Sequence, residues 1–215
     1  NDMMNFACVC YGDKYPVEYV QKLYNMVQRN TTIDHKFIVF TDHVKMHKMV
    51  SGDIDIRKFP VEDLNGWWNK LQLFHPNSHL DGTTLYMDLD VVITGNIDCF
   101  FNHNAEAIFT GMNDFNPSTG QWNSSVMKFK SAFLAEKLWF RFMDDRPNLL
   151  RRFAGDQNLI SDFIKGTPGC DSFPDSWTQS YKWYDRSGTR YSRQDMTYEH
   201  NGESLVTVFH GQPNP

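Results

Sequence analysis

Two aspartates separated by one residue, Asp88 and Asp90, follow the apolar run 85–87 and precede the apolar run 91–93. Because residues i and i+2 of a strand point to the same side, the two carboxylates can reach one cation. A divalent ion held by one or two carboxylates usually keeps positions open for phosphate oxygens. The triplet therefore predicts a site for a metal ion and a phosphate group. The alternative is a polar strand end whose acids cap a turn or pair with Lys and Arg.

The composition is that of a globular domain with an ordinary core. The chain has 215 residues, of which 40% are apolar and 15% aromatic, which is enough for a single domain. Its net charge is −5, and its 21 Lys and Arg residues are scattered along the sequence. Nucleic-acid binding would need a basic stripe, so no nucleic-acid partner is expected.

The cysteines and the termini indicate a protein of a reducing compartment. Cys8, Cys10, Cys99 and Cys170 show neither metal-ligand spacing nor the density of a disulfide scaffold. No apolar stretch is long enough to span a membrane, and the N-terminus lacks the regions of a signal peptide. We therefore expect a soluble, cytoplasmic chain without a membrane span.

The elements that must position the aspartates follow a strand, helix, strand order. Residues 5–11 form a continuously apolar run that stops at Gly12, which is typical of a buried strand. Apolar residues at steps of three and four predict a helix over 16–29, with Pro16 near its start. Strands are expected at 35–41 and 53–59. Such βαβ units imply a mostly parallel sheet with helices on both faces, and a ligand site beyond the carboxyl ends of the strands.

The remaining pattern continues this organisation without an internal linker. We expect helices at 67–74, 131–143 and from 156 to 164, and strands at 105–111 and 204–210. The segment 168–201 is rich in Ser, Asp, Gly and Tyr, which indicates irregular structure with short strands. The tryptophans are expected mainly in the core, with one or two free to stack on a sugar ring: Trp67, Trp68, Trp122, Trp177 and Trp183.

Several segments together, in one order, resemble the GT-A nucleotide-sugar glycosyltransferases, and specifically the retaining group that includes glycogenin and the bacterial lipopolysaccharide galactosyltransferases. The resemblance covers nearly the whole chain and extends to a viral enzyme of this fold that glycosylates capsid protein. The segments that carry it are Ala7-Cys8-Val9-Cys10-Tyr11 through Tyr15, Trp68-Asn69-Lys70-Leu71, Leu85 to Asp98 with Gly95-Asn96-Ile97-Asp98, Trp122-Asn123-Ser124-Ser125-Val126, Gly155-Asp156-Gln157 and Phe209-His210-Gly211.

The resemblance implies a single GT-A (Rossmann-like) catalytic domain over residues 1–215. Its implied activity is metal-dependent transfer of a hexose from a UDP-sugar to a hydroxyl of a glycan or a protein-linked glycan, with retention. Asp88, Asp90 and His210 would be the metal ligands, and oxygen ligands with one imidazole suit Mn²⁺ and tolerate Mg²⁺. The metal would act as a Lewis acid on the departing diphosphate.

The same resemblance implies which residues hold the UDP-sugar donor. The nucleobase would lie along the first strand, near backbone groups of Ala7 and Val9, with Tyr11 or Tyr15 stacking on it. Thr41 and Asp42 would contact the uridine or cap the following helix. The complete set of expected donor contacts is Ala7, Val9, Tyr11, Tyr15, Lys70, Leu89, Asn123, Ser124, Asp156, Gln157 and Gly211.

The catalytic residues implied by the resemblance are Lys70, Asp156 and Gln157. Double displacement would need a carboxylate near the anomeric carbon, and Asp156 is the acid to name, although similar enzymes use this acid rather to bind sugar hydroxyls. Capping of the helix that begins at Asp156 is the structural alternative. Gln157 would lie nearest the anomeric carbon, but an amide is a poor nucleophile. Front-face transfer, in which the diphosphate accepts the proton of the acceptor, is therefore the expected route.

The chain departs from the family after its His-Gly pair. The family carries a basic residue there that holds the diphosphate, whereas residues 212–215 are uncharged. Lys70, Arg57 and Arg190 are candidates to replace it, with Lys70 first. Because the chain stops directly after this motif, we expect a catalytic domain excised from a longer polypeptide.

Two other functions remain alternatives. A haloacid dehalogenase-type phosphatase also has two aspartates one residue apart after a strand, but there the motif opens the domain, whereas 87 residues precede Asp88 here. A nucleotide-sugar-binding module without catalysis is the second. The intact Asp-x-Asp, Asp-Gln and His residues argue against it, whereas the missing basic residue favours it.

Overall fold

The first strands pair in parallel, as the βαβ pattern predicts. The computed structural model describes residues 3–192, 197–210 and 215. β1 (Met4–Cys10) pairs with β2 (Lys36–Thr41), and β2 pairs with β3 (Ile54–Arg57), with α1 (Glu18–Asn30) between the first two. β4 (Thr83–Met87) joins the other edge of β1, also in parallel. The carboxyl ends of these four strands therefore meet at one edge, where the ligand of an open α/β sheet lies.

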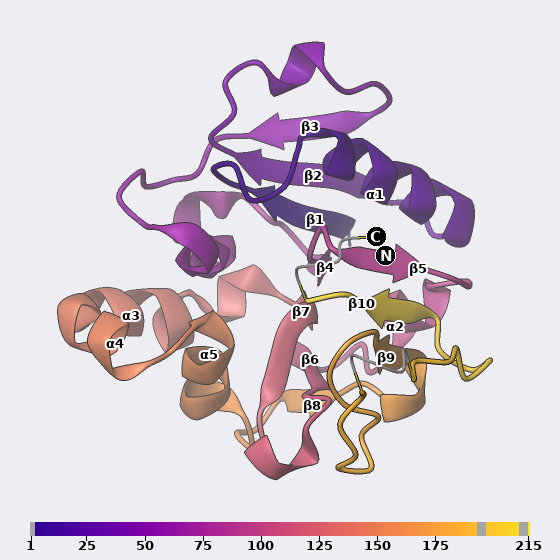
Figure 1. Cartoon of the computed structure of the whole chain (residues 1–215). Coiled ribbons are helices and arrows are strands. Elements are labelled where there is room, and N and C mark those ends of the chain that lie inside the picture. The colour runs from indigo at the N-terminus through magenta and orange to yellow at the C-terminus, as the bar shows by residue number, and fades with distance from the viewer. Residues whose placement is uncertain (1–2, 193–196, 211–214) are drawn as a thin grey trace.

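Three further strands complete a seven-stranded sheet of order β3-β2-β1-β4-β7-β6-β8 (Figure 1). β7 (Trp122–Phe129) runs antiparallel to both β4 and β6 (Phe109–Asn113), and β8 (Cys170–Ser172) runs parallel to β6. The predicted mostly parallel sheet is confirmed, with β7 as its antiparallel member. The strand expected at 105–111 begins and ends later in the chain than predicted.

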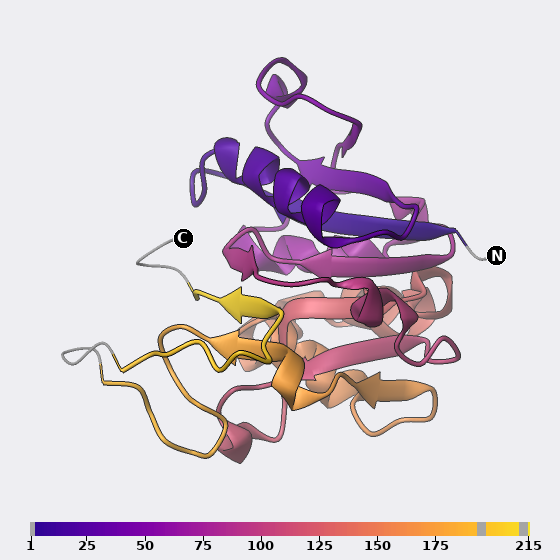
Figure 2. The same ribbon diagram turned by 90° about the vertical axis from the view of Figure 1, so that its right-hand side faces the viewer.

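A small second sheet holds the C-terminal strand beside the main one (Figure 2). β10 (Val206–Val208) lies between β5 (Val91–Ile93), to which it is antiparallel, and β9 (Thr178–Ser180), to which it is parallel. The final strand is confirmed, but it is shorter than the predicted 204–210. The short strands β8 and β9 are confirmed in the segment expected to be irregular.

Each face of the main sheet has its own apolar core, because successive strand residues point to opposite faces. In β1, Phe6 and Cys8 pack on the face covered by α1, whereas Ala7 and Val9 pack on the other. That second face is covered by α3 (Arg141–Asp144), α4 (Arg146–Arg152) and α5 (Asp156–Ile164) (Figure 1). The prediction of helices on both faces is confirmed.

Two predicted helices take other forms. The segment expected at 67–74 is a 3₁₀ helix, Gly66–Phe74, and the segment expected at 131–143 is broken into the 3₁₀ turn Ser131–Phe133, the π-helix Ala135–Phe140 and α3. The remaining helical segments are α2 (Asp98–Asn102) and the 3₁₀ turns Met46–Lys48, Pro76–Ser78, Pro117–Thr119 and Asp175–Trp177. Within the described ranges, we find no helix with the length and apolarity to cross a membrane.

A buried lysine ties α2 to the main sheet. Lys128 of β7 is 2% exposed, and its ammonium donates hydrogen bonds to the carbonyl oxygens of Phe101, at 3.3 Å, and of His103. These carbonyls are at the C-terminal end of α2, where backbone acceptors lack helical partners. Burial, helped by the charge of Lys130, lowers the pKa of Lys128 to about 8.

This lowered pKa predicts a pH-dependent contribution to stability. Between pH 8 and the ordinary pKa of lysine, the unfolded chain binds more protons at Lys128 than the folded chain does. Raising the pH through this range therefore stabilises the folded state. Relative to Lys128→Met, we expect the free energy of unfolding of the wild type to rise by about 2 kcal/mol from pH 7.5 to 10. Urea titrations across this range measure the difference. Lys36→Met, at an exposed lysine, is the control. A difference in unfolding free energy between the wild type and Lys128→Met that did not change with pH would contradict the lowered pKa of Lys128.

Candidate active site

The Asp88-Leu89-Asp90 triplet connects the two sheets. It follows β4 of the large sheet and precedes β5 of the small one. The backbone N–H of Asp88 donates to the carbonyl oxygen of Ser125 in β7 at 2.9 Å, and the carbonyl oxygen of Asp90 accepts from the N–H of Phe209 at 3.0 Å. The triplet is therefore held from both sides, at the carboxyl end of a parallel strand where the sequence predicted a site.

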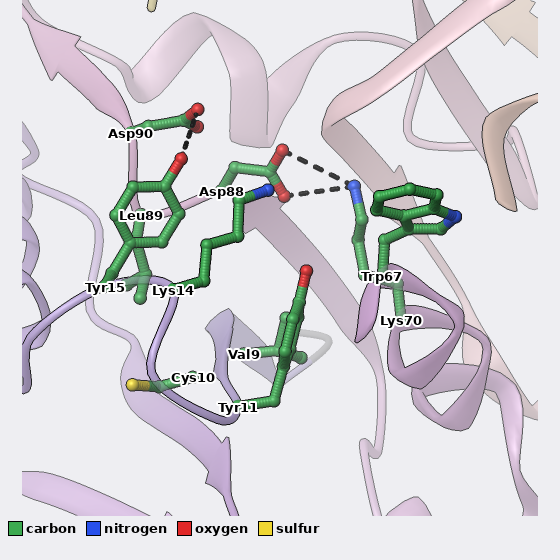
Figure 3. Close-up of a pocket in the computed structure, with 10 residues that line it drawn as sticks. All are labelled: Val9, Cys10, Tyr11, Lys14, Tyr15, Trp67, Lys70, Asp88, Leu89 and Asp90. Carbon is green, nitrogen blue, oxygen red and sulfur yellow. Dashed lines mark hydrogen bonds and ion pairs between the residues drawn. The ribbon is translucent and has the colours of Figure 1, made fainter. Parts of the chain in front are cut away.

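A pocket opens over this triplet (Figure 3). Its wall is formed by the end of β1 and the turn that follows, by the start of the 3₁₀ helix Gly66–Phe74, and by the triplet itself. The lining residues are Val9, Cys10, Tyr11, Lys14, Tyr15, Trp67, Lys70, Asp88, Leu89 and Asp90. Both aspartates of the motif therefore face one pocket.

Lys70 connects the triplet with two other predicted segments. The lysine is 6% exposed, and its ammonium lies 2.8 Å from Ser124 Oγ, 3.1 Å from Asp88 Oδ1 and 3.6 Å from Asp156 Oδ2. Figure 3 shows it approaching Asp88 from the side opposite Tyr15. Ser124 and Asp156, which follow Lys70 by 54 and 86 residues in the chain, thus both contact its ammonium.

The two carboxylates respond differently to this shared cation. Burial alone would raise both pKa values, but the attraction of Lys70 and a 2.6 Å hydrogen bond from Tyr86 Oη hold the pKa of Asp88 below its usual range. Asp156 is 3% exposed and further from the ammonium, so burial prevails over Lys70 and its pKa is raised. The ion pairs in turn overcome burial at Lys70 and raise its pKa.

The segment opposite the triplet is the N-terminus of α5. Asp156 is the first residue of this helix, where a carboxylate is favoured by the helix dipole. Gln157 follows, and its Oε1 lies 3.4 Å from the backbone N–H of Ser124. Asn123 Oδ1 accepts from the N–H of Ser125 at 2.9 Å, and both Asn123 and Ser124 are buried. The structure thus brings these sugar-site candidates together beside Lys70.

Tyr15 contacts the second aspartate. Its hydroxyl donates to Asp90 Oδ2 at 2.8 Å, and Asp90 is 5% exposed (Figure 3). Burial and the neighbouring carboxylate of Asp90 raise the pKa of Tyr15, so this hydroxyl stays protonated as a donor. The turn that carries Tyr15 is attached to the end of β2, because the N–H of Gly12 donates to both Asp42 carboxylate oxygens at 3.2 and 3.1 Å.

His210 lies at the end of the segment after β10. Its Nε2 is 3.0 Å from Ser180 Oγ, and its ring packs edge-on against Phe115 at 5.3 Å between ring centroids. Burial lowers the pKa of His210 to about 4, against the opposing effect of the Asp88 carboxylate. The imidazole is therefore neutral at physiological pH, which is the form that binds metals.

The predicted metal ligands have suitable chemistry, but the structure does not gather them as a set. Carboxylate oxygens and a neutral imidazole suit a hard divalent ion. The carboxylates instead contact Lys70, Tyr86 and Tyr15, and His210 contacts Ser180. Among residues 3–192, 197–210 and 215, no group of three or more His, Cys, Asp or Glu side chains is arranged to hold a metal ion.

Of the other residues predicted to contact the donor, some line the pocket and some do not. Val9, Tyr11 and Leu89 line the pocket. Ala7 does not, because it is fully buried in mid-strand, paired with Ile38 of β2 and Tyr86 of β4. Gly211 lies outside the described residues.

Three lining residues were not in the predicted set of site residues, namely Cys10, Lys14 and Trp67. Trp67 was grouped with the core tryptophans, yet it is 46% exposed at the pocket, whereas Trp122 is 3% exposed. No sequence pattern indicates that the lysine of a turn, or an exposed aromatic residue at the start of a helix, lines a pocket.

Of the cations proposed to replace the missing basic residue, only Lys70 lines this pocket. Arg57 instead donates to Asp55 and to the carbonyl oxygens of Ser78 and His79. Arg190 lies over the ring of Trp183, 5.5 Å from its centroid.

Solved structures similar to this chain are glycosyltransferases. GlyE of Streptococcus pneumoniae TIGR4 has a TM-score of 0.70 at 14% identity, over 100% of this chain and 56% of that chain. The galactosyltransferase LgtC, in complex with donor and acceptor sugar analogues, has a TM-score of 0.73 at 13% identity, over 98% and 88%. Mouse xyloside xylosyltransferase 1 has a TM-score of 0.61 at 10% identity, over 98% of both chains.

No protein-family model matches the sequence, and no curated protein is similar to it in sequence. The chain spans little more than half the length of GlyE. TM-scores of 0.61 to 0.73 establish a shared fold despite identities of only 10% to 14%, and that fold is the one the ordered motifs indicate. The chain has the fold of the GT-A glycosyltransferases.

Proposed function

We propose that this chain is a metal-dependent glycosyltransferase that moves a hexose from a UDP-sugar to a hydroxyl of a glycan or protein-linked glycan, with retention. The observation that carries the proposal is the cluster at Lys70, where Asp88, Ser124 and Asp156 converge from three separate elements. A charged cluster with shifted pKa values, at the carboxyl edge of a parallel sheet, is typical of a catalytic site.

The proposed metal ligands are Asp88, Asp90 and His210, with Mn²⁺ preferred and Mg²⁺ tolerated. When bound, the ion would supply Lewis-acid neutralisation of the charge on the departing diphosphate. The protein's own contribution is to keep its ligands in the binding form. Lys70 and Tyr86 hold Asp88 ionised, and burial holds His210 neutral.

The donor would extend from the pocket at the end of β1 toward the N-terminus of α5. The nucleobase would lie at Val9 and Tyr11, whose ring offers a flat stacking face. Asn123, Ser124, Asp156 and Gln157 would hold the sugar, since they provide hydroxyl, amide and carboxylate groups at the far side of Lys70. Lys70 itself would lie between the diphosphate and the sugar.

The proposed transfer breaks the bond between the anomeric carbon and the diphosphate oxygen and forms one to the acceptor oxygen on the same face. The acceptor's proton passes to the departing diphosphate oxygen, so no protein base is consumed. Asp156 would stabilise positive charge that develops on the sugar ring, and its pairing with Lys70 orients it for this role. Gln157 would hold the sugar near its anomeric carbon.

The proposal predicts slow hydrolysis of a UDP-sugar by the protein alone when Mn²⁺ is present. We expect one member of a panel of UDP- and GDP-hexoses to raise the melting temperature in a Mn²⁺-dependent way, because a ligand that binds only the folded state stabilises it. The same sugar nucleotide should then be hydrolysed, with release of UDP. Differential scanning fluorimetry followed by a UDP-release assay measures both.

The panel also separates the alternatives. Stabilisation by a sugar nucleotide with no hydrolysis under any metal would favour a binding module. Rapid release of phosphate from an aryl phosphate with Mg²⁺, and no effect of UDP, would favour a phosphatase. Asp156→Asn serves as a matched control, since it removes the proposed catalytic charge while keeping the size of the side chain.

A further inference from the structure

Three carboxylates lie at or beside the pocket over the triplet. Asp88 and Asp90 line it, and Asp156 is paired with the lining residue Lys70. Lys70 offsets one of them, and a divalent ion on the triplet would offset the other two. On the proposed function, a nucleoside diphosphate then enters with its own negative charge, and that charge still requires a cation.

Lys70 is poorly placed to provide this charge. Its ammonium has three protons to donate, and it already has three partners, Ser124, Asp88 and Asp156. Turning toward a phosphate would leave two largely buried carboxylates without their cation, which is costly. Lys70 therefore neutralises the floor of the pocket.

Lys14 is the second lysine among the lining residues of this pocket. It belongs to the turn between β1 and α1 that Gly12 fixes to Asp42, so its backbone is anchored while its side chain is exposed. Figure 3 shows the side chain extending into the pocket, between Tyr15 and Tyr11 and toward Asp88. Its Nζ lies 5.4 Å from the centroid of the Tyr15 ring.

We propose that Lys14 is the cation that holds the diphosphate of the donor, acting from the β1–α1 turn across the pocket from Lys70. A lysine serves this purpose as a mobile point charge on a flexible stem, and it can follow the diphosphate as the leaving group separates. In this arrangement the ligand is held between two turns, one carrying Lys14 and one carrying Asp88 and Asp90. Lys14 is a donor-binding residue, and this role rests on the proposed function.

The test compares UDP with uridine, because only UDP carries the group that Lys14 contacts. We expect Lys14→Ala to weaken UDP binding about tenfold in isothermal titration calorimetry with MnCl₂, and to change uridine binding by less than about twofold. Lys14→Arg should retain UDP affinity within about threefold. Raising the salt concentration should reduce the difference in UDP affinity between the wild type and Lys14→Ala, because salt screens the charge of an exposed side chain.

Lys22→Ala is the matched control. Lys22 is also an exposed lysine over a tyrosine, 5.0 Å from the centroid of Tyr19, but it does not line this pocket. We expect its affinity for UDP to remain that of the wild type.

The outcomes separate this inference from the proposed function. A wild type that binds neither UDP nor UDP-sugars would overturn both. A wild type that binds UDP, with Lys14→Ala unchanged, would overturn the role of Lys14 alone. Loss of UDP affinity in Lys182→Met instead, in a variant that unfolds at the wild-type temperature, would assign the role to the buried lysine whose charge acts on His210.

Discussion

Replacing Lys70 by Met is expected to lower the free energy of unfolding by about 3 kcal/mol at pH 7. The variant keeps the length of the side chain but removes the cation shared by Asp88 and Asp156. Breaking a buried ion pair from one side costs this much because the remaining charge is left uncompensated. Urea titration followed by circular dichroism measures the change.

The pH dependence distinguishes this cause from lost packing. In the wild type the lowered pKa of Asp88 contributes stability that is present above the unfolded value near 3.8 and is lost as pH falls through the folded value. Without Lys70, burial raises the pKa of both Asp88 and Asp156, so both acids take up protons on mild acidification. The loss of unfolding free energy in the variant relative to the wild type, its stability deficit, therefore becomes smaller as the pH falls. A deficit that is constant from pH 7 to pH 4 would show that packing alone was lost. Lys22→Met, at an exposed site, should leave stability unchanged.

Replacing Asp90 by Ala is expected to abolish Mn²⁺-dependent UDP binding while the fold stays intact. The affinity should fall about hundredfold or more, because even an indirect partner of a metal ligand contributes ten- to hundredfold. The carboxylate is 5% exposed, and its backbone is held independently by Phe209, so the triplet keeps its place. Calorimetric titration of UDP with MnCl₂ and with a chelator measures the effect.

Tyr15→Phe is the control for this variant. It removes the 2.8 Å hydrogen bond to Asp90 Oδ2 but keeps the carboxylate and the aromatic ring. We expect Mn²⁺-dependent binding to persist in Tyr15→Phe but to be about tenfold weaker than in the wild type, because the lost hydroxyl is an indirect partner of the proposed ligand. Undiminished Mn²⁺-dependent binding in Asp90→Ala would refute the assignment of Asp90 as a metal ligand.

The parts of the fold that the sequence predicted are those whose pattern is local. The apolar run of β1 and the three-four spacing of α1 are sufficient to place both within two residues. Strand direction could not be predicted in this way. β7 pairs with β4 in the antiparallel sense, and the sequence of β7 alone does not reveal its partner or its direction. The segment 131–143 has a helical apolar pattern, and Leu138, Trp139 and Phe142 do lie in the core, but residues 135–140 form a π-helix that the pattern does not reveal.

The candidate site likewise has a part that the sequence predicted and a part that it did not. The predicted positions of Asp88, Asp90, Lys70, Ser124 and Asp156 rest on ordered motifs, and the structure brings these residues to one region. Lys14 lies in a turn, and Trp67 lies at the start of a 3₁₀ helix; both escaped prediction because no periodicity in the sequence indicates that an exposed side chain faces a pocket. Ala7 was expected at the ligand because β1 leads to the pocket, but strand pairing uses its backbone on both sides.

The attachment of the carboxylate triplet to both sheets has a consequence for folding. Asp90 obtains its backbone partner only when Phe209, 119 residues later in the chain, has docked. Contacts this distant in sequence form late, because the loop between them must first be closed. A chain in which only the first βαβ units have folded would have a Rossmann-like sheet but an unfinished pocket over the triplet. On the proposed function, a nucleotide sugar would then bind the completed fold and not such a folding intermediate.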